Sequence, residues 1–226
     1  MTPTKRPTGA DPPHRRWAQP GSAHQSRQIE AAVRVLARGG LVVYPTETLY
    51  GLGADALDAA ALLRLIDLKG RQAGKAIAVL ISDLAMLDQI AAEVPAPARA
   101  LMRRFWPGPL TIVLRARDTV SPLLTGGGGI GVRLSSHPLA SALVCALSHP
   151  VTAPSANPAG RPAPRLVEQA RAYFGERIDY YLDAGPLRGE PASTVVDARE
   201  GLRVLRDGTI AAEDLRTTVR NEVAIW

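Results

Sequence analysis

Apolar residues recur along this chain with alternating helical and strand-like spacings. Between Ser26, a residue type that caps helix N-termini, and Gly39-Gly40, a typical helix stop, they fall on one helical face. Residues 41–44 then form a continuous apolar run that ends at Pro45. The pattern predicts a helix followed directly by a buried strand.

The same alternation continues through the rest of the chain. Further helices are predicted at residues 56–68, 83–92, 97–105, 138–147 and 166–174. Further strands are predicted at residues 76–81, 110–114, 130–134, 178–182, 193–197 and 204–206. Alternating helices and strands indicate an α/β fold built on a twisted, mixed sheet flanked by helices.

The domain boundaries follow from where this periodicity begins and ends. Residues 1–25 are rich in Pro, Arg, Gly and Ser without apolar periodicity, which predicts a disordered basic tail. Residues 26–210 form one predicted domain, large enough for a core in a chain of 226 residues. Residues 211–226 are long enough for one C-terminal helix.

The net charge of +6 does not by itself indicate a nucleic-acid-binding protein. Residues 1–27 hold five cations against one acid, so the remaining body carries only about +2. A local basic groove is still compatible with that balance.

Several other functional classes find little support in the composition. The single cysteine, Cys145, excludes an internal disulfide framework and favours a reducing compartment. The four histidines have no metal-ligand spacing. Neither a transmembrane-length apolar run nor a secretory signal is present, so we expect a cytoplasmic protein without membrane contact.

Polar groups gather where predicted strands and helices end. Residues 44–53 leave a strand at Pro45 with two hydroxyls and a carboxylate, which fits either a ligand site or a turn in which Thr46 and Thr48 cap the next helix. Lys69-Gly70-Arg71 ends a predicted helix. Its two cations either stabilise the helix C-terminus or form an anion-binding site. Ser155-Ala156-Asn157 is a proline-stiffened turn, either structural or suited to an oxygen-rich ligand.

Two further polar positions lie on predicted strands. Arg133 follows Gly131-Val132 among apolar residues, and a buried arginine needs a partner. A protein carboxylate or a substrate carboxylate would serve equally well. Ser193-Thr194 is either an ordinary strand start or a ligand contact, and Arg206 is either a solvated charge or a ligand contact.

Taken together and in this order, the phrases resemble the YrdC-like threonylcarbamoyl-AMP synthase family from about residue 27 to about residue 210. The phrases are Tyr44-Pro45-Thr46-Glu47-Thr48, Lys69-Gly70-Arg71, Gly131-Val132-Arg133, Ser155-Ala156-Asn157 and Glu190-Pro191-Ala192-Ser193-Thr194. The resemblance is to the short form of the family, and implies a YrdC-like domain with a concave basic groove.

The resemblance also implies roles for individual residues. The implied catalytic residues are Lys69, Arg71, Ser155 and Asn157. The implied threonine-binding residues are Thr46, Arg133, Ala153 and Ser193. The implied ATP-binding residues are Lys69, Arg71, Lys75, Ser155, Asn157, Arg161 and Arg206. Leu80, Ala163 and Asp207 depart from residues that relatives commonly carry at these positions.

The expected activity is formation of threonylcarbamoyl-AMP and pyrophosphate from L-threonine, bicarbonate or CO2, and ATP. Mg²⁺ is the expected cofactor, held mainly by ATP without dedicated protein ligands. The product would pass to a transferase complex that modifies position 37 of transfer RNA. The alternatives are a double-stranded RNA or tRNA-binding module of the same fold, and a carbamoyl-adenylate module like that of hydrogenase maturation.

Overall fold

The computed structural model describes residues 21–70, 76–188 and 191–223. The helices in these ranges are α1 Ala23–Leu36, α2 Ala59–Lys69, α3 Leu84–Ile90, α4 Ala96–Phe105, α5 Pro138–Leu147, α6 Val167–Phe174 and α7 Ala212–Val223. The strands are β1 Val42–Pro45, β2 Tyr50–Gly53, β3 Val79–Leu80, β4 Leu110–Arg115, β5 Gly129–Arg133, β6 Val151–Thr152, β7 Tyr180–Tyr181, β8 Thr194–Asp197 and β9 Arg203–Arg206. No helix in the described ranges is long and apolar enough to cross a membrane.

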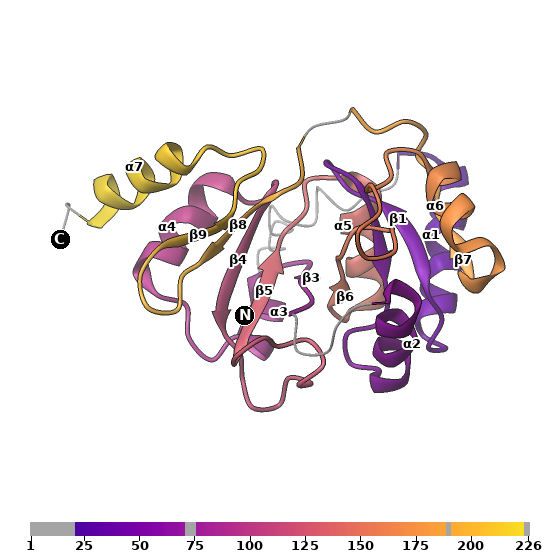
Figure 1. Ribbon diagram of the computed structural model, residues 1–226, viewed down its shortest axis with the longest axis horizontal. Helices are drawn as coiled ribbons and strands as arrows, with labels where there is room; N and C mark the ends of the chain where they lie inside the picture. Colours follow the sequence, from indigo (N-terminus) through magenta and orange to yellow (C-terminus); the bar gives the residue numbers. More distant parts are fainter. Residues whose placement is uncertain (1–20, 71–75, 189–190, 224–226) are drawn as a thin grey trace, which may run out of the picture.

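The predicted mixed α/β fold is confirmed, and the strands divide between two mixed sheets. The larger sheet has the order β6-β3-β5-β4-β8-β9, and the smaller has the order β2-β1-β7. Each contains both parallel and antiparallel pairs. In Figure 1, α3, α4 and α7 lie with the larger sheet, whereas α1, α2, α5 and α6 lie with the smaller one.

The two sheets are joined where β2 runs beside residues 151–156. Leu52 N donates to Pro154 O at 2.8 Å, and Ala156 N donates to Tyr50 O at 2.9 Å. Gly51 also forms an isolated antiparallel bridge with Ser155. The predicted single sheet is therefore two sheets linked edge to edge, and the Ser155 segment lies at their junction.

Strand β2 was not predicted, because its two glycines indicate a turn. In the structure, a Cβ atom on Gly51 or Gly53 would lie 3.1 or 3.0 Å from the ring of Tyr44 on the neighbouring strand. The glycines therefore make room for a fully buried aromatic ring. The Tyr44 hydroxyl donates to Thr152 O at 2.8 Å, which ties the hairpin to β6.

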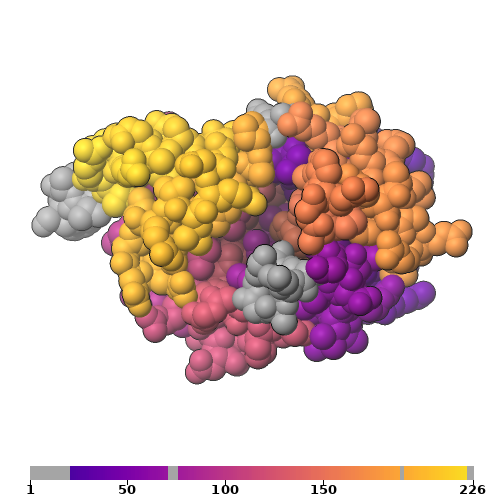
Figure 2. All heavy atoms as spheres, in the orientation of Figure 1, coloured from indigo at the N-terminus to yellow at the C-terminus, as the bar shows by residue number. Residues whose placement is uncertain are grey.

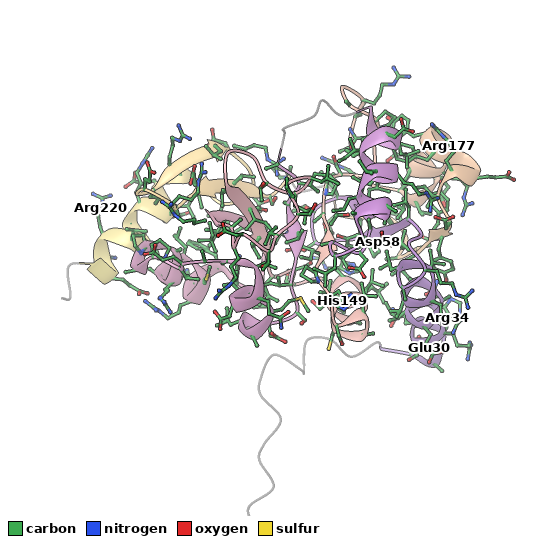
Figure 3. The ribbon with its side chains drawn as sticks, turned by 90° about the horizontal axis from the view of Figure 1, so that it is seen from below. Glu30, Arg34, Asp58, His149, Arg177 and Arg220 are labelled. Atoms are coloured by element: carbon green, nitrogen blue, oxygen red, sulfur yellow. The ribbon has the colours of Figure 1, made fainter. Side chains whose placement is uncertain are left out.

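The first helix begins earlier than predicted. Ser22, and not Ser26, is its N-cap, with Oγ accepting from Gln25 N at 3.2 Å. Ser26 lies in the helix and donates its hydroxyl to Ser22 O. The last residues of the predicted tail therefore belong to α1, while residues 1–20 lie outside the described ranges. Helix α2 begins at Ala59 because Asp58, labelled in Figure 3, caps it.

Tyr50 fastens the segment that follows β7. Its buried hydroxyl accepts from Ala184 N at 3.0 Å and lies 2.8 Å from the acceptor Gly185 O. Asp183 Oδ1 is a second acceptor at 3.1 Å. This contact fixes the start of the connection that leads to β8.

Replacing Tyr50 by Phe tests this contact. The change leaves Ala184 N and Gly185 O without their hydroxyl partner, so we expect the free energy of unfolding to fall by about 1–2 kcal/mol. Urea unfolding measures the change. Unchanged stability in Tyr50→Phe would show that water replaces the hydroxyl at no cost.

Candidate active site

Thr46 and Thr48 shape the turn between β1 and β2. The Thr46 hydroxyl donates to Leu49 O at 2.7 Å and accepts from the backbone N–H groups of Thr48 and Leu49, each at 3.2 Å. Both threonines are buried. The interpretation that they cap the next helix is wrong, because β2 follows them and Asp58 caps α2. A role for Thr46 in binding threonine stays a prediction.

Arg133 is the last residue of β5, and its side chain is buried against the β1–β2 turn. Its Nη2 forms an ion pair with Glu47 Oε1 at 2.8 Å and lies 3.4 Å from Thr48 Oγ1. Its Nε donates to Gly108 O at 3.2 Å. A protein carboxylate therefore partners this arginine. The remaining terminal nitrogen, Nη1, makes no hydrogen bond to a described residue, which leaves a donor edge for a second carboxylate.

Glu47 is the centre of a polar network. The sequence motifs did not assign a role to this residue. It accepts from Ser135 Oγ at 2.5 Å and from Ser136 N at 3.4 Å, in addition to the Arg133 ion pair. Burial alone would raise the pKa of Glu47, but Arg133 and Ser135 together lower it below its ordinary value of 4.5. The signal in the sequence was a carboxylate at the exit of a strand beside two hydroxyls.

His137 is a second residue that the sequence reasoning did not assign to the site. Its Nδ1 accepts from Leu139 N at 3.3 Å, which caps α5. Burial lowers the pKa of His137, although the nearby charge of Glu47 opposes that shift. The neutral ring therefore carries its proton on Nε2, because Nδ1 is the acceptor.

The lowered pKa of Glu47 predicts a pH dependence of stability. A carboxyl whose folded-state pKa lies below the unfolded value stabilises the protein above about pH 4.5 and loses that effect as pH falls through the folded-state pKa. We expect Glu47→Gln to cost about 3 kcal/mol at pH 7, since Arg133 is left buried without its counter-charge.

Urea unfolding of the wild type and Glu47→Gln from pH 7 to pH 3 measures this dependence. The stability difference should stay constant down to about pH 5 and shrink below pH 4.5. A difference that is already lost between pH 7 and pH 6 would contradict the assignment, because a group with a raised pKa would then be responsible.

Lys69 is the buried last residue of α2, and its ammonium group holds the serine–asparagine turn. Nζ donates to Ser155 O and to Asn157 O, both at 2.6 Å. Its own carbonyl accepts from Ala159 N at 2.8 Å. The cation therefore links α2 to residues 155–159. Gly70 is the C-cap of α2 and adopts a left-handed conformation with φ of 57°.

Asn157 carries the one buried polar side-chain atom in the described ranges that has no hydrogen-bond partner, Oδ1. Its Nδ2 donates to Pro158 O at 3.1 Å and to Arg161 O at 2.5 Å, which fixes the side chain. No group of three or more His, Cys, Asp or Glu residues in these ranges could hold a metal ion. An unpartnered amide oxygen can, however, serve as a ligand of Mg²⁺ or accept a hydrogen bond from water bound to the ion.

The other predicted site residues lie in different settings. Arg71 and Lys75 lie outside the described residues. Arg161 is exposed, and its backbone carbonyl receives the Asn157 amide. The backbone N–H of Ala153 donates to Ala78 O at 2.7 Å, beside β3.

Ser193 is buried just before β8, where the side chain of Arg206 reaches it. Arg206 Nη2 lies 3.0 Å from Ser193 Oγ, and the Ser193 hydroxyl is 3.2 Å from Thr111 Oγ1. Burial of the guanidinium and the charge of Arg133 both lower the pKa of Arg206. Thr194 N donates to Pro109 O, and Arg133 Nε donates to the neighbouring Gly108 O, so Ser193 lies in the same region as the Arg133–Glu47 pair.

The described site residues gather around the junction of the two sheets. Ser155 pairs with Gly51 on the hairpin whose turn carries Thr46, and Arg133 contacts that same turn through Glu47 and Thr48. Figure 2 shows the surface hollowed between the yellow C-terminal segments and the orange and violet segments. The predicted basic character of a groove here stays a prediction.

The fold and the cations at its strand and helix ends define a mixed α/β protein with a candidate site for anionic ligands. A profile of the Sua5/YciO/YrdC family, with the description "Telomere recombination", matches residues 34–208. The chain belongs to this family, as the sequence motifs predicted.

Individual relatives agree with the family profile. The chain is 38% identical over 194 residues to threonylcarbamoyl-AMP synthase of Pyrococcus abyssi, covering 85% of this chain and 57% of that protein. It is also 38% identical over 191 residues to a putative threonylcarbamoyl-AMP synthase of Mycobacterium tuberculosis, covering 84% and 88%. The chain therefore spans a little over half of the archaeal relative and most of the mycobacterial one.

A solved structure supports the same assignment. The crystal structure of P. abyssi Sua5 complexed with L-threonine matches with a TM-score of 0.81 and 37% identity. The match covers 84% of this chain and 56% of that one.

Proposed function

We propose that this protein is an L-threonylcarbamoyladenylate synthase. The observation that carries the proposal is the 88% coverage of a mycobacterial relative that is named for this activity. The geometry supports it, because a buried arginine and a lysine-held polar turn both contact the β1–β2 hairpin.

In the proposed reaction the amine of threonine captures CO2, supplied as such or as bicarbonate, and loses a proton to give a carbamate. A carbamate oxygen then forms a bond to the α-phosphorus of ATP, and the bond to the pyrophosphate leaving group breaks. The products are threonylcarbamoyl-AMP and pyrophosphate. Such nucleotidyl transfer depends mainly on alignment and charge neutralisation, so no protein nucleophile is required.

The amino acid and the nucleotide would occupy the two sides of the hairpin. Arg133 would bind the threonine carboxylate through Nη1, with Thr46, Ser193 and Ala153 lining that pocket. Lys69 would hold the Ser155–Asn157 turn in the shape that receives the triphosphate. Arg71, Lys75, Arg161 and Arg206 are the further proposed ATP contacts.

Mg²⁺ is the proposed cofactor, held mainly by the phosphates. Asn157 Oδ1 fits such a role, since it is an oxygen ligand, buried and without a partner in the described ranges. When bound, the ion neutralises charge on the phosphates. The product is proposed to pass to a transferase complex that modifies adenosine 37 of transfer RNA, in the cytoplasm.

Pyrophosphate release from ATP tests the proposed function. With Mg²⁺ and bicarbonate present, release should require L-threonine and should be clearly slower with L-serine. A folded protein that binds ATP without threonine-dependent release would overturn the synthase proposal. Salt-sensitive binding of double-stranded RNA by that protein would then favour the binding-module alternative.

A further inference from the structure

A β-bulge aims Arg206 at Ser193. Along the antiparallel pair of β8 and β9, Val196 pairs with Val204, whereas the next residue, Val195, pairs with Arg206. Leu205 is therefore an extra residue on β9, and it is half exposed. Without the extra residue, Arg206 would share a face with residue 194, because paired side chains lie on one face. The bulge moves it to the face of Val195 and, two residues back, of Ser193.

The Arg206 guanidinium forms three hydrogen bonds to Ser193. Nε and Nη2 donate to Ser193 O at 3.1 and 2.8 Å, and Nη2 also contacts Ser193 Oγ at 3.0 Å. The backbone and the side chain of Ser193 are thus held together by one planar group. A lysine could not reproduce this planar fork, because its three N–H donors all belong to a single nitrogen atom.

These contacts decide what the Ser193 hydroxyl can do. A serine hydroxyl has one proton to donate and two lone pairs to accept with. Arg206 can only donate, so it occupies one lone pair. Either hydroxyl can be the donor in the contact with Thr111 Oγ1 at 3.2 Å. When Thr111 donates, the serine proton is left for an acceptor oxygen of a ligand.

The charges around Ser193 suit an anionic amino acid. Arg133 and Arg206 are near enough for the charge of Arg133 to lower the pKa of Arg206. In the described ranges Glu47 neutralises Arg133, whereas Arg206 forms no ion pair with a described carboxylate. One excess positive charge, that of Arg206, therefore lies beside the Ser193 hydroxyl.

We propose that Arg206 is a positioning residue of the amino-acid pocket, which acts by fixing Ser193 so that its hydroxyl donates to the bound amino acid. This inference rests on the proposed function and adds to it. It gives Arg206 a task on the threonine side of the site, through Ser193, beyond the nucleotide contact that family resemblance implies.

Titration calorimetry with L-threonine in the absence of ATP tests the proposal. We expect Arg206→Gln and Arg206→Lys to weaken threonine binding at least tenfold in these ATP-free titrations. Arg203→Gln is the matched control, because Arg203 lies on the same strand, is exposed, and has its guanidinium 3.6 Å from Asp197 Oδ2. Circular dichroism and thermal unfolding of each variant separate loss of fold from loss of positioning.

A double-mutant cycle asks whether Arg206 acts through Ser193. If it does, Arg206→Gln should weaken threonine binding less than threefold when Ser193 is already alanine. Threonine affinity that is unchanged in Arg206→Gln, full rescue by Arg206→Lys, or additive effects in the cycle would each overturn the positioning role. Failure of the wild type to bind threonine would instead overturn the proposed function.

Discussion

Lys69→Met is expected to lose at least 100-fold in pyrophosphate release, with most of the loss in ATP binding. The buried ammonium donates to Ser155 O and Asn157 O, each at 2.6 Å. Methionine keeps most of the side-chain volume and removes both donors. The turn between these carbonyls then loses the group that holds its shape, and the proposed triphosphate site loses a cation.

The same substitution should also reduce stability. Two carbonyls lose charge-assisted hydrogen bonds at once, so we expect the free energy of unfolding to fall by about 2–3 kcal/mol. Calorimetric titration with ATP and urea unfolding measure the two effects on one sample. A partly unfolded variant also binds less ATP. The ATP affinities of the variant and the wild type are therefore compared without urea and well below the unfolding temperature of the variant.

Arg64→Gln is the control for Lys69→Met. Arg64 lies in α2, carries the same charge, and pairs with Asp179 at 3.1 Å on the surface. Exposed pairs of this kind contribute at most about 1 kcal/mol to the free energy of unfolding. Because the charge of Arg64 is paired with Asp179 and not with the Ser155–Asn157 turn, ATP affinity should stay within twofold of the wild type. Should Lys69→Met also stay within twofold, the proposal that this lysine organises the nucleotide site would be wrong.

Local periodicity was enough to predict most helices and strands, because their signals lie within ten or so residues. The apolar run before Pro45 became β1, and the apolar face after Ser26 became most of α1. Strand β2 escaped because glycines that normally mark turns serve here to admit the ring of Tyr44. Tyr44 lies within ten residues of both glycines, but their spacing does not reveal that its ring packs over them.

The candidate site was predictable in its parts and not in its pairings. Motif resemblance pointed to Arg133 and Ser193, and the cost of burying a charge predicted that Arg133 has a partner. The choice of Glu47 as that partner depends on how β5 lies against the β1–β2 turn. The contact between Arg206 and Ser193 depends on a single extra residue in β9. The pattern of apolar and polar residues along the sequence does not reveal that bulge.

Arg133→Gln is expected to raise the threonine concentration needed for half-maximal pyrophosphate release more than 100-fold, with less than a threefold change for ATP. Glutamine has no positive charge with which to neutralise the substrate carboxylate. Steady-state kinetics with each substrate varied in turn give both values. An ATP requirement that rises more than the threonine requirement would show that Arg133 does not serve the amino acid.

The ion pair with Glu47 complicates that experiment and also provides its control. Arg133→Gln alone leaves the Glu47 carboxylate buried without its counter-charge, so stability should fall by about 3 kcal/mol. In the double variant Glu47→Gln, Arg133→Gln, two amides can pair, and most of that loss should be recovered. Threonine binding should not recover with it, because the substrate carboxylate still lacks its cation. Recovery of both together would mean that Arg133 serves the fold alone, and that another group binds the carboxylate.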